Sequence, residues 1–372
     1  MIPSVPWNGT HGAHHGAMQR RQFLGGAAAA VSAALIGGRA RAAAPSVIRV
    51  GVPGVGVGNR PVTGGSFFSL LHLQGTLAEE FKKDGIEVKW NFFRGAGPAV
   101  NEAVANNLLD IWTHGHLPSV VGRASGLKTR LLASASRRGH AYLVVPADSP
   151  ITGVKDLRGK KVAFQKGTAS QLSANRILEG HGLSEKDIRS ISMDASTAKA
   201  AIATKDIDAV FGGTDYLSLR DQGIAKVVYT TKGDSPTYPS NSGIIAREDF
   251  INEYPDVVQK IITLAVKSAS WLADEKNRTQ AFQLWSKSGT PFANYKEAQQ
   301  GEDMKQNASP LLDEYAIARY KSAVADSKKY GLIRSTFEVE PWTDRRFLNR
   351  ALKDTGLERF WAEWDANGKP KG

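Results

Sequence analysis

The sequence predicts an α/β fold that is divided into two lobes. Strand-like segments alternate with helix-like segments, and glycine-rich loops join them, which is typical of sheets covered by helices. About 328 residues follow a predicted export signal, enough for two lobes. A strand-like segment at 241–246 follows a compact α/β unit, so we expect the chain to cross between the lobes twice. A protein of this kind binds its ligand in the cleft between the lobes.

The first lobe is predicted to hold residues 45–140 and 240–372. It begins with a strand at 47–52, a glycine-rich loop and a helix near 66–83. Strict alternation of Ile86, Val88, Trp90 and Phe92 marks the next strand, because successive side chains of a strand point to opposite faces. A turn at 95–98 opens a helix with proline at its first position, and a short strand at 110–113 follows. From Tyr254 the apolar residues recur at helical spacing.

The second lobe is predicted to hold residues 141–239. It begins with an apolar strand at 141–145, followed by a turn and a strand within 157–164. The next helix is expected to end near Glu179, where Gly180 is well placed to stop it. Strands at 190–193, 209–211 and 226–229 then alternate with helices at 196–204 and 215–222.

Residues 1–44 are predicted to be a twin-arginine signal peptide. Paired arginines at 20–21 precede a mildly apolar stretch at 23–38, and small residues around Ala42 form an A-x-A cleavage site. The apolar stretch is too short and too rich in glycine for a membrane-spanning helix. We therefore expect the mature chain to begin near residues 43–45 and to be a soluble periplasmic protein. Met18 is an alternative start to Met1.

The composition excludes several kinds of site. There is no cysteine, so the chain has no disulfide, no thiolate metal site, no thiol nucleophile and no residue for a lipid anchor. The formal net charge is +12, but four arginines lie in the predicted signal and no run of five like charges occurs, so nucleic-acid binding is not indicated. A moderately basic surface weakly favours small anions, although ordinary solubility explains it equally well.

The strongest candidate for a ligand site is the loop Gln165–Ser170. A strand ends at Phe164, Gly167 allows a tight turn, and Thr168 or Ser170 can cap the next helix. The first N–H groups of that helix and the positive end of its dipole would face the cleft, where they suit an oxyanion such as sulfonate, sulfate or nitrate. A plain capped helix has the same pattern. The chain lacks the glycine–lysine pattern of a nucleotide phosphate loop.

Three other loops contribute candidate ligand-binding residues. The turn at 95–97, beside Arg94, is expected to be the equivalent site in the first lobe. The loop at 212–215 joins a strand end to a helix cap, and the long glycine-rich loop carries an arginine that suits an anion. A solvated surface loop is the alternative in each case. The candidates in these loops are Gly95, Ala96, Gly97, Thr214, Asp215 and Arg60.

Two histidines follow another strand end, in the segment Thr113-His114-Gly115-His116. Their spacing would allow both to touch a ligand. A metal site is not indicated, because no third ligand is apparent and the nearby acids do not cluster. We expect contact with the tail of a ligand, with a surface loop as the alternative.

No arrangement of residues indicates catalysis. There is no G-x-S-x-G nucleophile elbow and no H-E-x-x-H zinc motif. Paired carboxylates such as Glu79 and Glu80 fall on helix faces and are expected to be solvated. We therefore expect a binding protein without a cofactor rather than an enzyme.

Four short segments carry a family resemblance. They are V-A-F-Q-K-G-T at 162–168, F-R-G-A-G-P at 93–98, D-L-R-G-K at 156–160 and D-A-V at 208–210. On these segments the chain resembles the periplasmic binding proteins of ABC importers for aliphatic sulfonates, nitrate and taurine. The resemblance implies a two-lobed type II periplasmic binding protein fold with a ligand cleft between the lobes. It also implies a monomer that hands an alkanesulfonate, taurine, sulfate ester or similar anion to an ABC permease in the inner membrane.

Three loops beside the expected pocket depart from the family pattern. Residues 115–118 read G-H-L-P where the family usually has G-D-I-P, residues 211–215 read F-G-G-T-D in place of W-x-P, and the loop at 54–65 is longer than usual. The ligand therefore need not be a simple alkanesulfonate. The alternatives are a secreted hydrolase acting on sulfate esters, or a binding protein for nitrate or a thiamine precursor.

Overall fold

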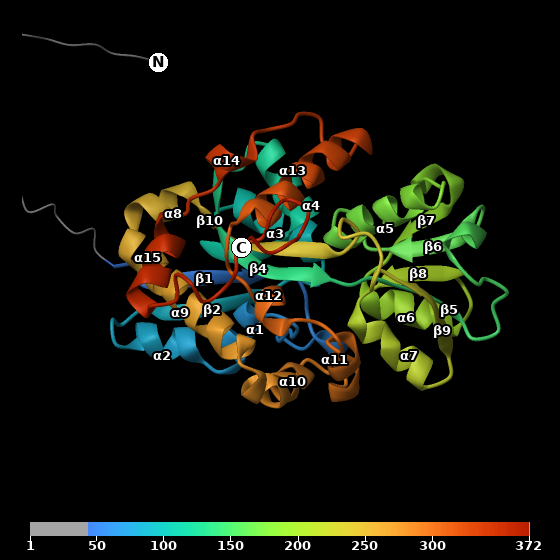
Figure 1. The fold of residues 1–372 in the computed structure, drawn as a ribbon, viewed down its shortest axis with the longest axis horizontal. Helices are drawn as coiled ribbons and strands as arrows, with labels where there is room; N and C mark the ends of the chain where they lie inside the picture. The colour runs from blue at the N-terminus through green and yellow to red at the C-terminus, as the bar shows by residue number, and fades with distance from the viewer. Residues whose placement is uncertain (1–43, 372) are drawn as a thin grey trace, which may run out of the picture. The chain divides into compact units, whose positions relative to one another are not determined.

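The computed structural model describes residues 44–371 (Figure 1). Apart from Ala44, the predicted signal peptide lies outside the described residues, as do both alternative starts, so twin-arginine export stays a prediction. Within 44–371, no helix is both long enough and apolar enough to cross a membrane.

The first sheet has five strands, in the order β2, β1, β3, β10, β4. Strand β1 pairs in parallel with β2 and β3, whereas β10 runs antiparallel to β3 and β4. The strand bounds are β1 Val47–Val52, β2 Glu87–Phe92, β3 Ile111–Gly115, β4 Thr129–Gly139 and β10 Ser240–Arg247.

The second sheet repeats the same pattern with the order β7, β6, β8, β5, β9. Here β6 pairs in parallel with β7 and β8, and β5 runs antiparallel to β8 and β9. Thus β1 corresponds to β6, and β2 to β7. We call the elements packed around each sheet the first lobe and the second lobe. The strand bounds are β5 Tyr142–Pro146, β6 Lys161–Phe164, β7 Arg189–Ser192, β8 Ala209–Gly212 and β9 Ala225–Thr230.

The chain passes between the sheets twice, after β4 and before β10. Two mixed five-stranded sheets with this connection confirm the predicted α/β fold with two lobes.

Helices cover both faces of the second sheet, which is why its strands are apolar without a polar side. Along β8, Ala209 and Phe211 face one buried cluster, while Val210 between them faces another. Such continuous apolar runs are typical of parallel strands buried on both faces. The helices of this lobe are α5 Ala169–Gly180, α6 Ala195–Ala203 and α7 Leu217–Asp221.

The first lobe has one large core, and helices from the end of the chain complete it. Helix α9 packs against both α1 and α15 (Figure 1). The helices of this lobe are α1 Phe67–Leu73, α2 Thr76–Lys82, α3 Ala96–Ala105, α4 His116–Ala124, α8 Glu248–Glu253, α9 Pro255–Ala273, α10 Arg278–Ser286, α11 Phe292–Ala298, α12 Met304–Asn307, α13 Glu314–Lys329, α14 Val339–Trp342 and α15 Arg346–Thr355.

Several elements differ from the sequence prediction. Helix α3 begins at Ala96, so Pro98 is its third residue and not its first. Strand β3 extends to Gly115, so His114 lies within the strand and not in the loop after it. The single helix expected near 66–83 is two helices, because Gly75 adopts a left-handed φ of 72° between α1 and α2. Strand β4 was not predicted at all. Its segment T-R-L-L-A-S-A-S-R-R-G has neither strict alternation nor β-branched residues after Thr129, and its pairing with β10 contains register shifts.

Candidate ligand-binding cleft

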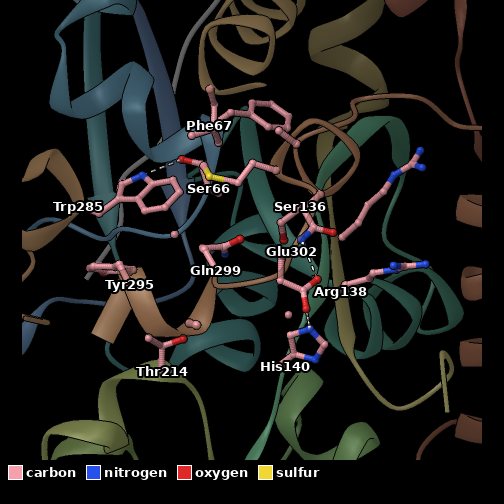
Figure 2. A pocket seen from close by; sticks show the side chains of 18 of the residues that line it. Ser66, Phe67, Ser136, Arg138, His140, Thr214, Trp285, Tyr295, Gln299 and Glu302 are labelled. Atoms are coloured by element: carbon pink, nitrogen blue, oxygen red, sulfur yellow. Dashed lines mark hydrogen bonds and ion pairs between the residues drawn. The ribbon is translucent and has the colours of Figure 1, made fainter. Parts of the chain in front are cut away.

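Two adjoining cavities lie between the first and second lobes. The outer cavity has a volume of about 460 Å³ and the inner cavity about 250 Å³. Each takes lining residues from both lobes, and both include Gly65, Thr214 and Tyr295. The shared residues show that the two cavities are neighbours. Figure 2 shows the inner cavity.

Two ion pairs border the outer cavity. Arg94 of the first lobe faces Asp194 of the second, with Nη2 and Oδ2 3.1 Å apart. Lys199 and Asp215, both in the second lobe, bring Nζ and Oδ2 within 2.7 Å of each other. The outer cavity therefore holds cations that already have carboxylate partners. An anionic ligand has to compete with those carboxylates.

The start of α3 is open toward the outer cavity. Gly95 occupies the N-cap position and provides no capping side chain, and Ala96 lines the cavity. Ala96 has a φ of 50°, a left-handed conformation that is strained for a residue with a Cβ. Gly97 lies so close to Pro118 that a side chain there would collide with it. The N–H of Ala96 donates to the carbonyl of Phe93 at 2.9 Å, and Pro98 has no N–H. Of the first three residues of α3, only Gly97 therefore keeps an N–H for a ligand beside Arg94.

The start of α6 faces the same cavity but is capped. Asp194 Oδ1 accepts hydrogen bonds from the N–H groups of Ser196 and Thr197, at 3.0 and 3.2 Å. Burial alone would raise the pKa of Asp194, but its bonds with Thr197 and Arg94 outweigh burial and lower it. Since α6 follows β7 as α3 follows β2, these two starts correspond in the two lobes. The expectation that the turn at 95–97 corresponds to the start of α5 is thereby corrected.

The start of α5 is satisfied by its own loop. The hydroxyl of Thr168 accepts from the N–H of Ser170 at 3.2 Å and donates to the carbonyl of Gln165 at 2.7 Å. The N–H of Gly167 donates to Oε1 of Gln171 at 2.7 Å. Hydrogen bonds within the chain therefore occupy several of the groups that the sequence analysis assigned to an oxyanion.

This loop also rests against the first lobe. A Cβ placed on Gly167 would lie 2.8 Å from Cγ of Pro98, and one on Gly115 would lie 2.8 Å from Cβ of Ala169. Gly167 and Gly115 thus allow a close approach of backbone between the lobes. Gly167, Thr168 and Ser170 line neither of the two cavities, whereas neighbouring Gln165 lines the outer one.

The two histidines predicted to contact the ligand are buried beneath the cleft. His114 is 1% exposed, and its Nε2 lies 3.2 Å from the carbonyl oxygen of Gly97 in α3. His116 is 0% exposed; its Nδ1 lies 3.2 Å from the carbonyl oxygen of Asn241, and its Nε2 lies 3.4 Å from Nη1 of Arg176 in α5. Neither lines the two cavities. Through these hydrogen bonds His114 contacts α3 and His116 contacts α5.

Burial also keeps these histidines neutral. It lowers the pKa of His114 to about 4, against a smaller opposing effect of the bond with Gly97. It lowers the pKa of His116 to about 3, and the charge of Arg176 adds to the effect. Neutral, hydrogen-bonded rings of this kind are structural groups at neutral pH.

Aromatic side chains and one acid define the inner cavity. Phe67, Trp285 and Tyr295 line it, and the indole N–H of Trp285 donates to the carbonyl of Ser66 at 3.3 Å (Figure 2). Across from them, Oε1 of Glu302 lies 3.1 Å from Nε2 of His140. Arg137 and Arg138 line this cavity as well, and the guanidinium of Arg137 is paired with Asp313.

The other predicted residues differ in position. Thr214 borders both cavities and Asp215 borders the outer one, so the second-lobe loop at 212–215 does reach the cleft. Arg60 is exposed and lines neither cavity, although neighbouring Asn59 lines the outer one. Among residues 44–371, no group of three or more histidines and acids is placed to hold a metal ion.

Several cleft residues escaped the sequence analysis. Lys199 stands inside an ordinary helix segment. Tyr295 and Glu302 come from the helical region near the end of the chain, and Glu302 is 162 residues from His140, its partner in the inner cavity. Asp194 was recognisable as a helix cap before the small residues of α6. That pattern marks a helix start but carries no information about a facing arginine.

Comparison with known proteins gives the family. The sequence pattern of the family described as NMT1/THI5 like matches residues 80–278. The chain belongs to the NMT1/THI5-like family. A protein of Bacillus subtilis (strain 168) named for binding aliphatic sulfonates is 27% identical over 288 residues, which are 76% of this chain and 83% of that protein.

Solved structures of this family share the fold. A structure described as the periplasmic sulfonate-binding protein SsuA from Methylobacillus flagellatus KT has a TM-score of 0.73 and 29% identity, covering 86% of this chain and 97% of that one. The alkanesulfonate-binding protein SsuA from Xanthomonas axonopodis pv. citri, bound to MOPS, has a TM-score of 0.68 and 22% identity, covering 82% and 100%. The desulfurization enzyme DSZB also shares the fold, at 18% identity and a TM-score of 0.62. The two-lobed architecture is therefore that of periplasmic substrate-binding proteins, and the relatives named for sulfonate binding are proteins of this kind.

Proposed function

We propose that this protein is the periplasmic solute-binding component of an ABC importer and captures an organic anion, a sulfonate or a compound like it. The observation that carries the proposal is the outer cavity, where Arg94, Lys199 and the uncapped start of α3 meet between the lobes. Membership of the family and the relatives named for sulfonate binding support it. The partner is a permease in the inner membrane, and the protein acts as a monomer.

The anionic head exchanges places with two carboxylates. Its oxygens accept hydrogen bonds from the guanidinium of Arg94, the ammonium of Lys199 and the N–H of Gly97 at the start of α3. A hydrogen bond to a charged group contributes roughly 1.5–3 kcal/mol. Part of this is offset because both cations leave their present partners, Asp194 and Asp215. The remainder suits micromolar binding, for which about 8 kcal/mol is needed.

Ligand binding and lobe closure are coupled in this proposal. Arg94 belongs to the first lobe and Lys199 to the second, so an anion between them joins the lobes. Contacts away from the cavities already join them: Arg220 of α7 donates to both carboxylate oxygens of Glu297 in α11, at 2.6 and 2.7 Å. Closure removes water from the anion and strengthens each of its hydrogen bonds.

A second candidate is a secreted hydrolase that acts on sulfate esters. One observation favours testing it, since a desulfurization enzyme shares the fold. The purified protein is incubated with aryl and alkyl sulfate esters, and released sulfate is measured by ion chromatography. We expect no release. Turnover that survives repeated purification would replace the binding function by an enzymatic one.

The anion site is tested with two substitutions that break the same ion pair. We expect Arg94→Gln to weaken binding of 1-butanesulfonate, measured by calorimetry, by about tenfold or more, since one charge-assisted hydrogen bond is lost. Asp194→Asn also breaks the pair but keeps the cation, and asparagine still caps α6. We expect it to leave the affinity unchanged or to raise it, because it removes a competing carboxylate.

Equal weakening by both substitutions would contradict the site, because the pair would then act only as a clasp between the lobes. Nitrate, sulfate and a thiamine pyrimidine precursor serve as competing ligands in the same titrations. Tighter binding of any of these than of every sulfonate would overturn the ligand class.

A further inference from the structure

We propose that Tyr295 of α11 determines how long a tail the bound anion can carry. This inference rests on the proposed function, since it places the anionic head in the outer cavity beside Arg94. Tyr295 stands at the boundary between the outer and the inner cavity. A tail that extends from the head toward the inner cavity therefore meets the Tyr295 ring, and the protein selects anions whose tails end before it.

The boundary between the cavities is built around Tyr295. Gly65, Thr214 and Tyr295 line both cavities, and among these three Tyr295 alone has a large side chain. A Cβ placed on Gly65 would lie 4.0 Å from Cε1 of Tyr295, so the ring lies against Gly65. The carbonyl of Thr214 accepts from Nδ2 of Asn294, the neighbour of Tyr295 in α11, at 3.3 Å. Since Thr214 belongs to the second lobe, both lobes contribute to this boundary.

The Tyr295 ring is held in place by its surroundings. Tyr295 is 8% exposed, and the centre of its ring lies 5.4 Å from that of Trp285, which Figure 2 shows beside it. Its hydroxyl oxygen lies 3.1 Å from Oγ of the buried Ser288. A Cβ placed on Gly64 would collide with the same hydroxyl. A ring packed in this way cannot turn aside without losing the hydrogen bond and leaving a void, so it acts as a fixed wall.

A fixed wall changes how the affinity depends on the length of the tail. Each methylene group that the cleft buries raises the affinity by about fourfold. A tail that reaches Tyr295 has to displace a buried ring or leave its last carbons in water, so the gain stops there. Behind the ring, Phe67 and Trp285 of the inner cavity offer apolar surface to a longer tail. Removing the ring would make that surface accessible.

Straight-chain alkanesulfonates from ethanesulfonate to 1-octanesulfonate test the inference by calorimetry. The measured quantity is the ratio of the affinities for 1-octanesulfonate and ethanesulfonate, because changes in folding or lobe closure affect both ligands alike. For the wild-type protein we expect the affinity to rise with tail length and then to level off or fall within the series. Tyr295→Ala should extend the rise and increase the ratio by about tenfold or more, since about two further methylene groups become buried. Tyr295→Leu, which loses less volume, should increase the ratio by a smaller factor.

Two substitutions serve as controls. Tyr295→Phe keeps the ring and removes only the hydroxyl, so the ratio should stay close to that of the wild-type protein. Phe292→Ala removes an exposed ring from the same helix, outside both cavities, and should not change the ratio.

Two results would overturn the inference and leave the proposed function intact. One is an even rise of the wild-type affinity up to 1-octanesulfonate, which decides the matter even if the variants fail to fold. The other is a ratio that neither Tyr295→Ala nor Tyr295→Leu changes, because the tail would then leave the cleft for solvent and not meet the ring. Failure of every alkanesulfonate to bind would overturn the proposed function as well.

Discussion

The starts of α3 and α5 both face the opposite lobe, yet they offer different things to a ligand. The start of α3 has a glycine at its cap position and borders the outer cavity beside Arg94. The start of α5 is capped by Thr168 and lies against Gly115 and Pro98 of the first lobe. A dipole directed at the cleft is common to both. What separates them is that a side chain caps α5, whereas α3 has no capping side chain and keeps the N–H of Gly97 for a ligand.

Because of this difference, the starts of α3 and α5 are suited to different roles. Since α5 meets the first lobe through glycines, it is suited to fix how closely the lobes approach. Since α3 has no capping side chain and keeps the N–H of Gly97 beside Arg94, it is suited to meet an anion. The histidines below them follow the same division, because His114 bonds with Gly97 of α3 and His116 bonds with Arg176 of α5. The following predictions test this division.

The largest effect is expected from Gly115→Val, which tests the contact of α5 with the first lobe. Its Cβ would lie 2.8 Å from Cβ of Ala169, closer than two such carbons pack. Overpacking of this kind costs about 1–3 kcal/mol. The cost falls on the closed form alone, so we expect affinity for the ligand to fall by roughly tenfold to hundredfold. Calorimetry measures the affinity, and small-angle scattering with ligand measures the closure.

Gly153→Val is the control for this substitution. Gly153 belongs to the second lobe, has an extended backbone that any residue adopts, and has no atom within 4 Å of a Cβ placed on it. It should leave the affinity and the scattering unchanged. An unchanged affinity for Gly115→Val would show that binding does not need this contact between the lobes.

An effect on stability rather than on affinity is expected from the two buried histidines, His114 and His116. The pKa of His114 is lowered to about 4 and that of His116 to about 3, chiefly by burial. Unfolding returns both to an ordinary value of about 6.5. The contribution of each histidine to the unfolding free energy is therefore fully present above pH 6.5. It is lost as the pH falls toward the pKa of that histidine in the folded protein. Each histidine contributes a slope of about 1.4 kcal/mol per pH unit.

Urea unfolding between pH 7 and pH 3.5 measures these slopes. We expect His114→Gln and His116→Gln each to remove one slope between pH 6.5 and pH 4. Below pH 4 only His116 should still contribute. Curves for the variants that run parallel to the wild-type curve would mean that the rings are hydrated in the native protein. In that case both would return as candidates for ligand contact.

The strands could be predicted from the sequence more accurately than the residues of the site. Apolar runs such as 47–52 and 141–145 predict strands because burial on both faces leaves a local pattern. Strand β4 leaves none, and Gly75 divides a helix whose apolar spacing continues across it. The loop at 165–170 was recognised correctly as the start of a helix. The residues that face it across the cleft could not be predicted, because local sequence carries no information about them.

The cleft itself depends on residues that are distant in the chain. Arg94 meets Asp194, and the loop at 64–66 meets Tyr295 and Glu302 around the inner cavity. Such pairs arise from the order of strands in each sheet and from helices that complete the first lobe late in the chain. Neither periodicity nor a cap motif carries that information. Thr214, Asp215 and Ala96 were found because they end or follow strands, where ligands of α/β proteins usually bind.

The smallest effect is expected from Thr168→Val, and it addresses the comparison most directly. Valine has nearly the same shape but neither accepts from the N–H of Ser170 nor donates to the carbonyl of Gln165. Losing the cap should cost about 1 kcal/mol of unfolding free energy, measured with urea. Because the hydroxyl serves the helix and not the cavity, affinity for a sulfonate should stay within about twofold. A tenfold loss of affinity with the stability unchanged would reverse the two roles, making the start of α5 the anion site and leaving Arg94 as a clasp.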